Sequence, residues 1–446
     1  MKNYAISLGS TFVLLFALSL RLMPRATVPA HLSGHKVYAE DELVDAEQRQ
    51  ELMGIIREMK QFMSNVDQAK VIGFVPKYEN LGEGVPLNAE GSCDHPYLFP
   101  NADNSICILP ERIDVGRHFV STGGLEGRKE GFQDLISRVS SFQKITVVKD
   151  MDQYPLVKSL FDSEKFQKAA KSVCPQDRTY LDPFQFNFIF NLPGQTVAMH
   201  LDAPYFWGAS RSRFPQWLLV AMVFSGLFLD RFINQIQVVT YLHEWSVDPA
   251  EVANSSSSRG SSGGDFVFYN NATSVGVVNS LPGSGSIVDG SKVLHAAKIY
   301  RPEVKAPFLD KNKLSQLVYV GNDDWELQAD GEVLQRYKTD DLRISMVYRA
   351  RCFADEAEAQ RYAALPEEEM LTLETVMGVF KKDMVSRGVT TPAKLASMEP
   401  LAFLFLIMDT YITYPLPPWE FAWVPFNYCA LPKQLPWTEP FLKMIC

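Results

Sequence analysis

NLPGQTVAMHLD, residues 191–202, is the stretch of this sequence that decides the fold and points to a metal site. It ends with His200 and Asp202 two positions apart, and side chains two positions apart point to the same face of a strand. A second histidine, His295, follows much later in the chain. Two imidazoles and one carboxylate form the triad that holds ferrous iron and leaves coordination positions open. We therefore predict that His200, Asp202 and His295 are metal ligands and catalytic residues.

Three further motifs follow this stretch in the chain. They are GGDFVFY (263–269), GSGSIVD (283–289) just before His295, and RISMVY (343–348). Together with residues 191–202 they resemble the Fe(II)/2-oxoglutarate-dependent dioxygenases of the double-stranded β-helix superfamily, in particular the prolyl-hydroxylase-like ones. In that family a Pro-Gly-Gln turn leads into the H-x-D strand, a Gly-Gly strand lies between the two halves of the metal site, and an R-x-S strand closes the barrel. The resemblance covers about residues 180 to 353.

The resemblance implies an α+β fold with a double-stranded β-helix (jelly-roll) core buttressed by helices. It implies Fe(2+), 2-oxoglutarate and O2 as cofactor and cosubstrates, with ascorbate as a further candidate. Arg343 would bind the distal carboxylate of 2-oxoglutarate, and Ser345, on the same face, would be a second cosubstrate contact. The reaction would hydroxylate a C–H bond of an unidentified substrate, a protein or a small molecule, and release succinate and CO2.

Two features depart from the family pattern. The family often has a tyrosine three residues before the turn glycine, where this chain has Asn191. The basic residue also usually follows the distal histidine closely, so an insertion, residues 304–338, must loop out before Arg343. Arg349 lies six residues further on and on the same face of a regular strand, and is the alternative cosubstrate ligand.

The composition shift after residue 353 and the apolar N-terminus suggest five regions. They are a signal anchor or signal peptide (1–24), a tether (25–40), a helical and irregular N-terminal region (41–179), the dioxygenase domain (180–353), and a helical, then Pro- and aromatic-rich C-terminal extension (354–446).

The N-terminus predicts entry into the secretory pathway. Lys2 precedes an apolar run, residues 4–20, which has about the length of a short membrane span. Arg21 and Arg25 follow the run, which favours an uncleaved anchor over a cleaved signal peptide. Two Asn-x-Ser/Thr sequons, at Asn254 and Asn271, agree with this route. We expect a membrane-anchored or lumenal protein of the ER or Golgi.

Six cysteines permit disulfides, and Cys93 and Cys107, which flank a short loop, are the easiest pair to close. No C-x-x-C occurs, so the sequence indicates neither a zinc site nor a thioredoxin-like motif. The formal net charge is −9, and no basic stretch alternates with aromatic residues. Nucleic acid is therefore not expected as a partner.

Local patterns predict several elements outside the motifs. Residues 41–67 have apolar residues at helical spacing, and residues 131–173 read as helices around one strand at 144–149. The apolar run 217–229 is too short to cross a bilayer and is expected to be a buried helix or strand. Residues 355–387 read as helices.

Two other functions fit the sequence. One is a lumenal prolyl or lysyl hydroxylase of protein substrates, which has the same chemistry but a committed substrate. The other is a non-catalytic, membrane-tethered β-barrel binding module whose metal site is unused. Release of succinate on addition of iron, ascorbate and 2-oxoglutarate distinguishes the enzymes from the module.

Overall fold

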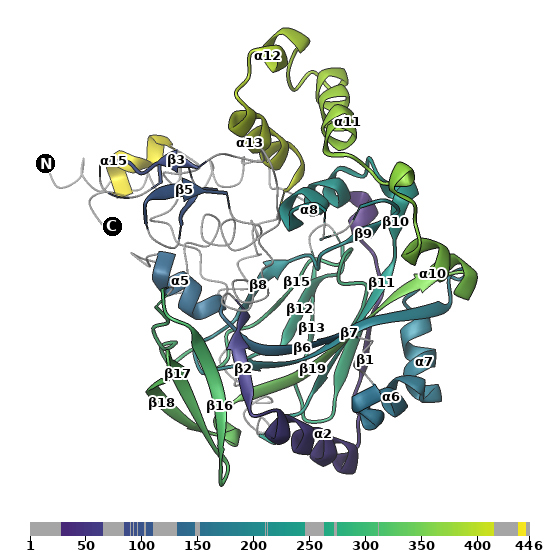
Figure 1. The fold of residues 1–446 in the computed structure, drawn as a ribbon, viewed down its shortest axis with the longest axis vertical. Helices are drawn as coiled ribbons and strands as arrows, with labels where there is room; N and C mark the ends of the chain where they lie inside the picture. The colour runs from purple at the N-terminus through teal and green to yellow at the C-terminus, as the bar shows by residue number, and fades with distance from the viewer. Residues whose placement is uncertain are drawn as a thin grey trace, which may run out of the picture.

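A computed structural model describes most of the chain and is the structure used below (Figure 1). The described residues are 28–65, 84–89, 91, 93–95, 97–101, 104–109, 132–147, 152–209, 211, 213–245, 263–271, 274–310, 312–413 and 436–442. The predicted anchor, residues 1–24, and the sequon at Asn254 lie outside them.

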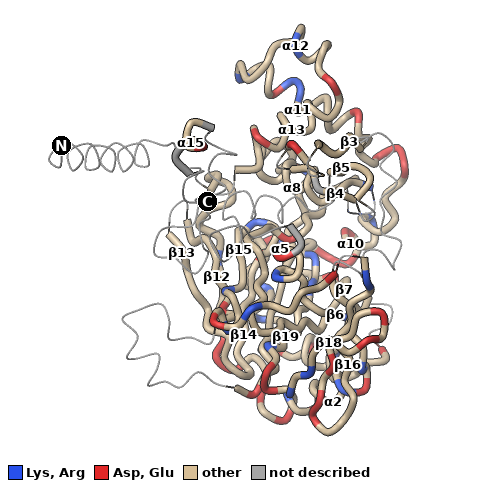
Figure 2. Tube along the Cα trace, turned by 90° about the vertical axis from the view of Figure 1, so that its left-hand side faces the viewer, with Lys and Arg blue, Asp and Glu red and all other residues tan. Residues whose placement is uncertain are grey.

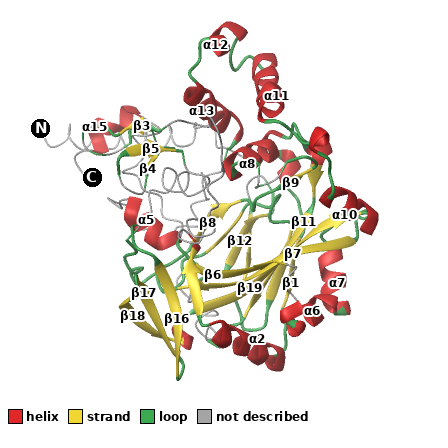
Figure 3. Ribbon diagram, in the orientation of Figure 1, coloured by secondary structure: helices red, strands yellow, loops and turns green. Residues whose placement is uncertain are grey.

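The described part combines antiparallel sheets with helices that lie outside them (Figure 3). The strands are β1 (Val37–Glu40), β2 (Gln61–Ser64), β3 (Val85–Pro86), β4 (Phe99–Pro100), β5 (Ile106–Ile108), β6 (Phe142–Val147), β7 (Tyr180–Asn191), β8 (Val197–His200), β9 (Tyr205–Phe206), β10 (Phe232–Ile233), β11 (Gln235–Tyr241), β12 (Phe266–Tyr269), β13 (Val275–Val278), β14 (Gly285–Val288), β15 (His295–Ala297), β16 (Ser315–Gly321), β17 (Asp324–Ala329), β18 (Glu332–Lys338) and β19 (Arg343–Phe353). The α-helices are α2 (Ala46–Met59), α5 (Phe132–Val139), α6 (Pro155–Asp162), α7 (Glu164–Lys171), α8 (Gln216–Ser225), α10 (Glu356–Ala363), α11 (Leu373–Ser386), α12 (Pro392–Ala396), α13 (Pro400–Tyr411) and α15 (Glu439–Leu442).

Two of the sheets form the barrel-like core. The large sheet contains the run β14-β11-β19-β7, and a second sheet has the order β13-β12-β15-β8. Along the chain, β7 lies in the large sheet, β8 in the small one, β11 in the large, β12 and β13 in the small, β14 in the large, β15 in the small and β19 in the large. This alternation between two antiparallel sheets is the winding of a jelly roll, which agrees with the expected core.

The large sheet continues beyond the jelly roll on both sides. β1 pairs with β14 at one edge, and the other edge continues β6-β2-β16-β17-β18. The strands β16 to β18 come from the segment that the sequence analysis expected to loop out before Arg343. They form an antiparallel meander that joins the sheet through β2.

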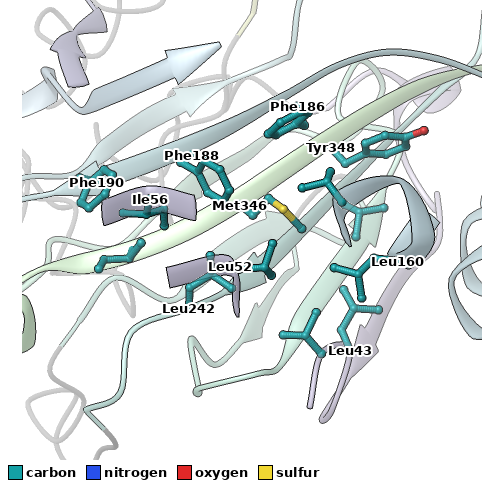
Figure 4. Packing of buried hydrophobic residues seen from close by; sticks show 14 of the residues in the cluster. Leu43, Leu52, Ile56, Leu160, Phe186, Phe188, Phe190, Leu242, Met346 and Tyr348 are labelled. Carbon is teal, nitrogen blue, oxygen red and sulfur yellow. The ribbon is translucent and has the colours of Figure 1, made fainter. Parts of the chain in front are cut away.

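The main apolar core lies on the outer face of the large sheet, beneath α2, α6 and α7 (Figure 4). β7 contributes three phenylalanines in alternation, and β19 contributes its even-numbered residues from Ile344 to Cys352. α2 places Leu52 and Ile56 against them. Because side chains alternate along a strand, the odd-numbered residues of β19 from Arg343 to Arg349 face the interior between the two sheets.

A second apolar cluster is built from helices. It joins α8, α11 and α13 with Leu32 and Val28 from the start of the described chain. Every residue of α8 except Ser225 is buried, and Figure 2 shows no charged residue along this helix. Most of the apolar run 217–229 is therefore a buried helix, one of the two forms expected from its sequence, but the helix ends before Gly226 and Leu229 is exposed.

Two predictions of local structure were wrong. The single helix predicted over residues 41–67 is replaced, in the part described, by α2 and then β2, because α2 ends at Met59 and Phe62 lies in a strand and is buried in the core. A capping box at Asp45 and Gln48 fixes the start of α2.

The second prediction that was wrong concerns the metal-ligand candidates. The strand β8 ends at His200, so Asp202 lies in the segment after this strand rather than on it.

Two disulfides link the described part. Cys93 pairs with Cys107, as expected, and Cys174 after α7 pairs with Cys352 in β19. Cys429 and Cys446 lie outside the described residues. Of the helices described, none is both long and apolar enough to cross a bilayer.

Candidate metal centre

His200 and His295 face each other across two paired strands of the small sheet. His200 is the last residue of β8 and His295 the first of β15, and the two are direct partners in the antiparallel register. Their ring centroids are 4.3 Å apart. Each is buried, with 7% and 3% of its surface exposed. The sheet thus brings together two imidazoles that are far apart in sequence.

Asp202 reaches the same point from the segment that follows β8. Its backbone N–H donates to the carbonyl of Gly290 at 2.8 Å, which ties this segment to the turn before His295. Its Oδ1 lies 3.7 Å from Nε2 of His200. One ligand atom from each of His200, Asp202 and His295 falls within 4.8 Å of the others. The side chains converge although the strand does not extend to Asp202.

Both histidines present the same ring nitrogen to the centre. Nδ1 of His200 lies 2.7 Å from the carbonyl of Ala198, and Nδ1 of His295 lies 2.8 Å from that of Val293. A carbonyl oxygen only accepts, so each Nδ1 carries the proton and each Nε2 keeps its lone pair. Burial lowers the pKa of His295 to about 3, so this ring is neutral at physiological pH. Neutral imidazoles with a fixed Nδ1–H are the form in which histidine binds metals.

The carboxylate of Asp202 is charged and only half satisfied. Burial by itself would raise its pKa, but the guanidinium of Arg349, with His200 and His295, holds the pKa well below its ordinary value. Arg349 donates from NH2 to Oδ1 at 3.2 Å. Oδ2 is buried and has no hydrogen-bond partner. An unpartnered, buried carboxylate oxygen beside two lone pairs is a donor set that fits a divalent cation.

Arg343 lies in the interior between the two sheets. It is 4% exposed, and its Nε donates to the carbonyl of Gly264 and its NH1 to Oδ1 of Asn191, at 2.8 and 2.9 Å. Asn191 is its direct partner in the register of β7 and β19. A guanidinium has five N–H groups, so three remain after these two bonds, enough for an end-on contact with a carboxylate. Ser345 is buried on the same face of β19.

The sequence analysis did not identify several polar residues that face this interior. The ring of Tyr241 lies under Arg343, 5.1 Å from the guanidinium carbon. Tyr241 supplies an aromatic ring in the region where the family has a tyrosine at the position of Asn191. The Tyr241 hydroxyl, the Ser286 hydroxyl and Nδ2 of Asn191 are buried without a hydrogen-bond partner. The alternation of side chains along β11 and β14, with β14 paired to β11 and β11 to β19, is the signal that could have found Tyr241 and Ser286.

Gln237 and Arg349 form a second layer beside the triad. Nε2 of Gln237 lies 3.4 Å from Nε2 of His295, and its Oε1 accepts from Nε of Arg349 at 3.1 Å. Arg349, the alternative cosubstrate ligand of the sequence analysis, is thus placed on the metal-ligand candidate Asp202. Arg343 and Arg349 sit at two different places in the interior.

The other histidines that the structure describes do not join the triad. His243 is buried, and its two ring nitrogens contact the carbonyls of Ser280 and Ile344. His31 contacts the carbonyl of Val223, His35 that of His31, and His95 stacks on Phe405. His118 lies outside the described residues.

Comparisons with known proteins give one kind of match. No family model matches the sequence, and no curated protein sequence matches it. Solved structures do match.

A Pseudomonas putida prolyl-4-hydroxylase is 12% identical and is matched over 71% of this chain and 92% of its own, with a TM-score of 0.25. A Trichoplax adhaerens prolyl hydroxylase is 10% identical over 50% of this chain and 66% of its own, with a TM-score of 0.24. An α-ketoglutarate-dependent epimerase from nogalamycin biosynthesis is 9% identical over 73% and 81%, with a TM-score of 0.24.

A further match, from Burkholderia pseudomallei, is described as an oxidoreductase of the 2OG-Fe(II) oxygenase family. The identities of these structures to this chain and their TM-scores are low. We therefore base the functional proposal on the chain's own residues.

Proposed function

We propose that this chain is an Fe(II)- and 2-oxoglutarate-dependent dioxygenase that hydroxylates a C–H bond of its substrate. The observation that carries the proposal is the convergence of one ligand atom each from His200, Asp202 and His295, all within 4.8 Å of one another, at one buried point. A two-histidine, one-carboxylate set is the ligand set of non-haem Fe(II) oxygenases.

His200, Asp202 and His295 would hold the iron, each with a fixed role. The Ala198 and Val293 carbonyls orient the two imidazoles, and Arg349 holds Oδ1 of Asp202 in place. When bound, Fe(II) with 2-oxoglutarate and O2 supplies the oxidising power, through decarboxylation of 2-oxoglutarate to succinate and CO2. The burial of all three ligands keeps bulk water away from them.

Arg343 would bind the distal carboxylate of 2-oxoglutarate. Its partners Gly264 and Asn191 hold the guanidinium in place, and Tyr241 covers one of its faces. The hydroxyls of Tyr241 and Ser286 and the amide Nδ2 of Asn191 are buried donors without partners, and a bound dicarboxylate would satisfy such groups. Ser345, next to Tyr241 in the register of β11 and β19, would be a further contact.

Turnover of 2-oxoglutarate tests the proposal. Purified protein is given iron(II), ascorbate and 2-oxoglutarate, and succinate is measured. We expect succinate to form slowly without a prime substrate, and His200→Ala to release none. A reconstituted protein that binds iron and forms no succinate with any candidate substrate would instead favour the non-catalytic binding module.

A lumenal hydroxylase of protein substrates is the second candidate. Two disulfides in the described part support an oxidising compartment, because disulfides are rare in cytosolic proteins. Asn271, the first residue of a sequon, is exposed in the turn between β12 and β13, where a glycan could be attached. In secretory expression, we expect a glycosidase-sensitive mass shift that Asn271→Gln reduces by one glycan.

The membrane partner and the ER or Golgi location remain proposals that rest on residues 1–24. We expect the full chain to stay with membranes after alkaline carbonate washing, and a version starting near His35 to be soluble. A soluble full chain with an intact N-terminus would refute the anchor. A soluble chain with a new N-terminus between about residues 20 and 35 would identify a cleaved signal peptide.

A further inference from the structure

Two arginines of β19 adjoin the buried triad and still reach solvent. Arg349 bonds to Asp202, and Arg351, two residues further on, bonds to Asp182. Each arginine side chain is 17% exposed. The three triad residues, in contrast, are all buried. The two guanidinium groups therefore lie at the boundary between the candidate metal centre and solvent, and no role assigned above uses Arg351.

Arg351 is held in one orientation by aromatic rings. Its guanidinium carbon lies 5.3 Å from the ring centroids of Phe184 and Tyr205 and 4.9 Å from that of Tyr362. Asp182 accepts from its Nε and NH2 at 2.8 and 2.7 Å. A guanidinium stacked on rings and bonded on one edge loses little entropy when its other edge binds an anion.

Both arginines keep donors that no residue uses. Arg349 employs Nε on Gln237 and NH2 on Asp202, and Arg351 employs Nε and NH2 on Asp182. In the described part of the chain, neither NH1 has a hydrogen-bond partner, and neither is among the fully buried unpartnered atoms. The Tyr205 hydroxyl likewise has no hydrogen-bond partner in the described part and is not among the fully buried unpartnered atoms. The two NH1 groups and the Tyr205 hydroxyl thus remain available to a ligand, and Arg349 joins them to Asp202.

The local charge balance favours an anion. Burial raises the pKa of Tyr205, while Arg351, Arg211 and Arg349 act to lower it and Asp202 to raise it. These charges therefore all lie within electrostatic reach of the Tyr205 hydroxyl. Asp202 and Asp182 offset the charges of the two β19 arginines to which they are bonded, so further positive charge comes from Arg211 and from a divalent metal that Asp202 would hold.

We propose that Arg349, Arg351 and Tyr205 form a substrate subsite, here called the arginine rim, for an anionic group carried on an apolar body. The anionic group is a carboxylate, phosphate or sulfate, which matches the geometry of guanidinium donors. Phe184 and Trp207 provide the apolar surface next to it, since Phe184 contacts Tyr205 and Trp207 contacts Tyr362. The inference rests on the proposed function, because it places the bound substrate beside the iron.

The anion could belong to a free small molecule or to an acidic side chain of a peptide, and matched probes distinguish the two. Benzoate is compared with benzamide, and the end-blocked dipeptide Asp-Phe with end-blocked Asn-Phe. Binding is measured by calorimetry on the iron- and 2-oxoglutarate-loaded protein without oxygen. We expect the acidic member of at least one pair to bind roughly tenfold tighter or more, the value of a charge-assisted hydrogen bond.

Variants test whether the arginine rim causes the preference. Arg351→Gln should bring the acidic probe to within about twofold of its neutral partner, and Tyr205→Phe should weaken it to a smaller extent. Arg351→Lys keeps the charge if Arg351→Gln folds poorly, and it should retain part of the preference. Arg387→Gln, at the exposed residue that follows α11, is the matched control and should change nothing.

Three results would overturn the inference. The acidic and neutral probes could bind equally, or neither acidic probe could bind up to millimolar concentration. A preference for the acidic probe that survives Arg351→Gln would be the third. These outcomes are read from binding and not from turnover. Failure of succinate release together with a preserved anion preference would therefore reject the proposed function and keep the subsite.

Discussion

Replacing Arg343 by alanine is expected to separate binding of 2-oxoglutarate from binding of the metal. The structure leaves three N–H groups of Arg343 unused after its bonds to Gly264 and Asn191. A lost charge-assisted contact costs about 1.5 to 3 kcal/mol, so KM for 2-oxoglutarate should rise roughly tenfold to a hundredfold. Iron affinity should change little, because Arg343 contacts none of the triad residues.

Arg349→Ala is the internal control for this prediction. Arg349 contacts Asp202 and Gln237, so its loss should affect the metal rather than 2-oxoglutarate. Removal of a group that orients a metal ligand typically lowers metal affinity by about 10- to 100-fold. The two variants should therefore show opposite patterns when KM for 2-oxoglutarate and the Kd for iron are both measured.

Arg343→Ala also leaves two buried acceptors, the Gly264 carbonyl and Oδ1 of Asn191, without their donor. If water does not replace the guanidinium, each lowers the free energy of unfolding by about 1 to 3 kcal/mol. Arg343→Lys keeps the positive charge with fewer donors and serves if the alanine variant unfolds; its KM should rise by a smaller factor. A large KM effect in Arg349→Ala and none in Arg343→Ala would refute this assignment, and Arg349 would take the cosubstrate role.

Three further predictions concern the surroundings of the site. In Gly290→Ala, the new Cβ would lie 2.3 Å from Oδ2 of Asp202, so the amount of iron retained should fall sharply. Gly378→Ala in α11, where the new Cβ meets open space, is the control and should retain iron fully. Equal iron content in the two variants would contradict this prediction. Loss of the Cys174–Cys352 disulfide, which closes a separation of 178 residues, should lower the free energy of unfolding by up to about 5 kcal/mol in denaturant titrations, and a loss below about 1 kcal/mol would argue against it. Burial, together with the Arg343 charge, lowers the pKa of His243 to about 3. Below pH ~6.5 the unfolded state therefore binds a proton at His243 that the folded state does not bind. From this residue alone, the free energy of unfolding should fall by about 1.4 kcal/mol for each pH unit between pH ~6.5 and pH 3. The slope should be smaller by one proton in His243→Gln, and an unchanged slope would show that His243 does not titrate in this way.

The ligand candidates could be found from sequence because a strand fixes side-chain direction over short distances. His200 ends β8 and His295 begins β15, and the motifs around them place both at the same end of the small sheet. Asp202 was found for a reason that was only partly right, since the strand stops before it and Gly290 positions the segment instead.

Contacts between distant strands could not be read from the sequence. The bond between Arg349 and Asp202 and the ring of Tyr241 under Arg343 depend on the register of β11 and β19, which no local pattern encodes. The prediction of one helix over residues 41–67 was wrong for a related reason. Phe62 and Met63 continue the helical spacing of α2, but tertiary pairing with β16 makes them a strand.

Iron stoichiometry tests the central claim most directly. The wild-type protein, its Asp202→Ala variant and its His200→Ala variant are reconstituted with Fe(II) without oxygen, desalted, and measured by elemental analysis. The account predicts about one equivalent in the wild type and close to none in either variant, with the circular dichroism spectrum unchanged, because an open site that loses one of three ligands no longer holds its metal. A variant that retains a full equivalent of iron would remove that residue from the site and contradict the account.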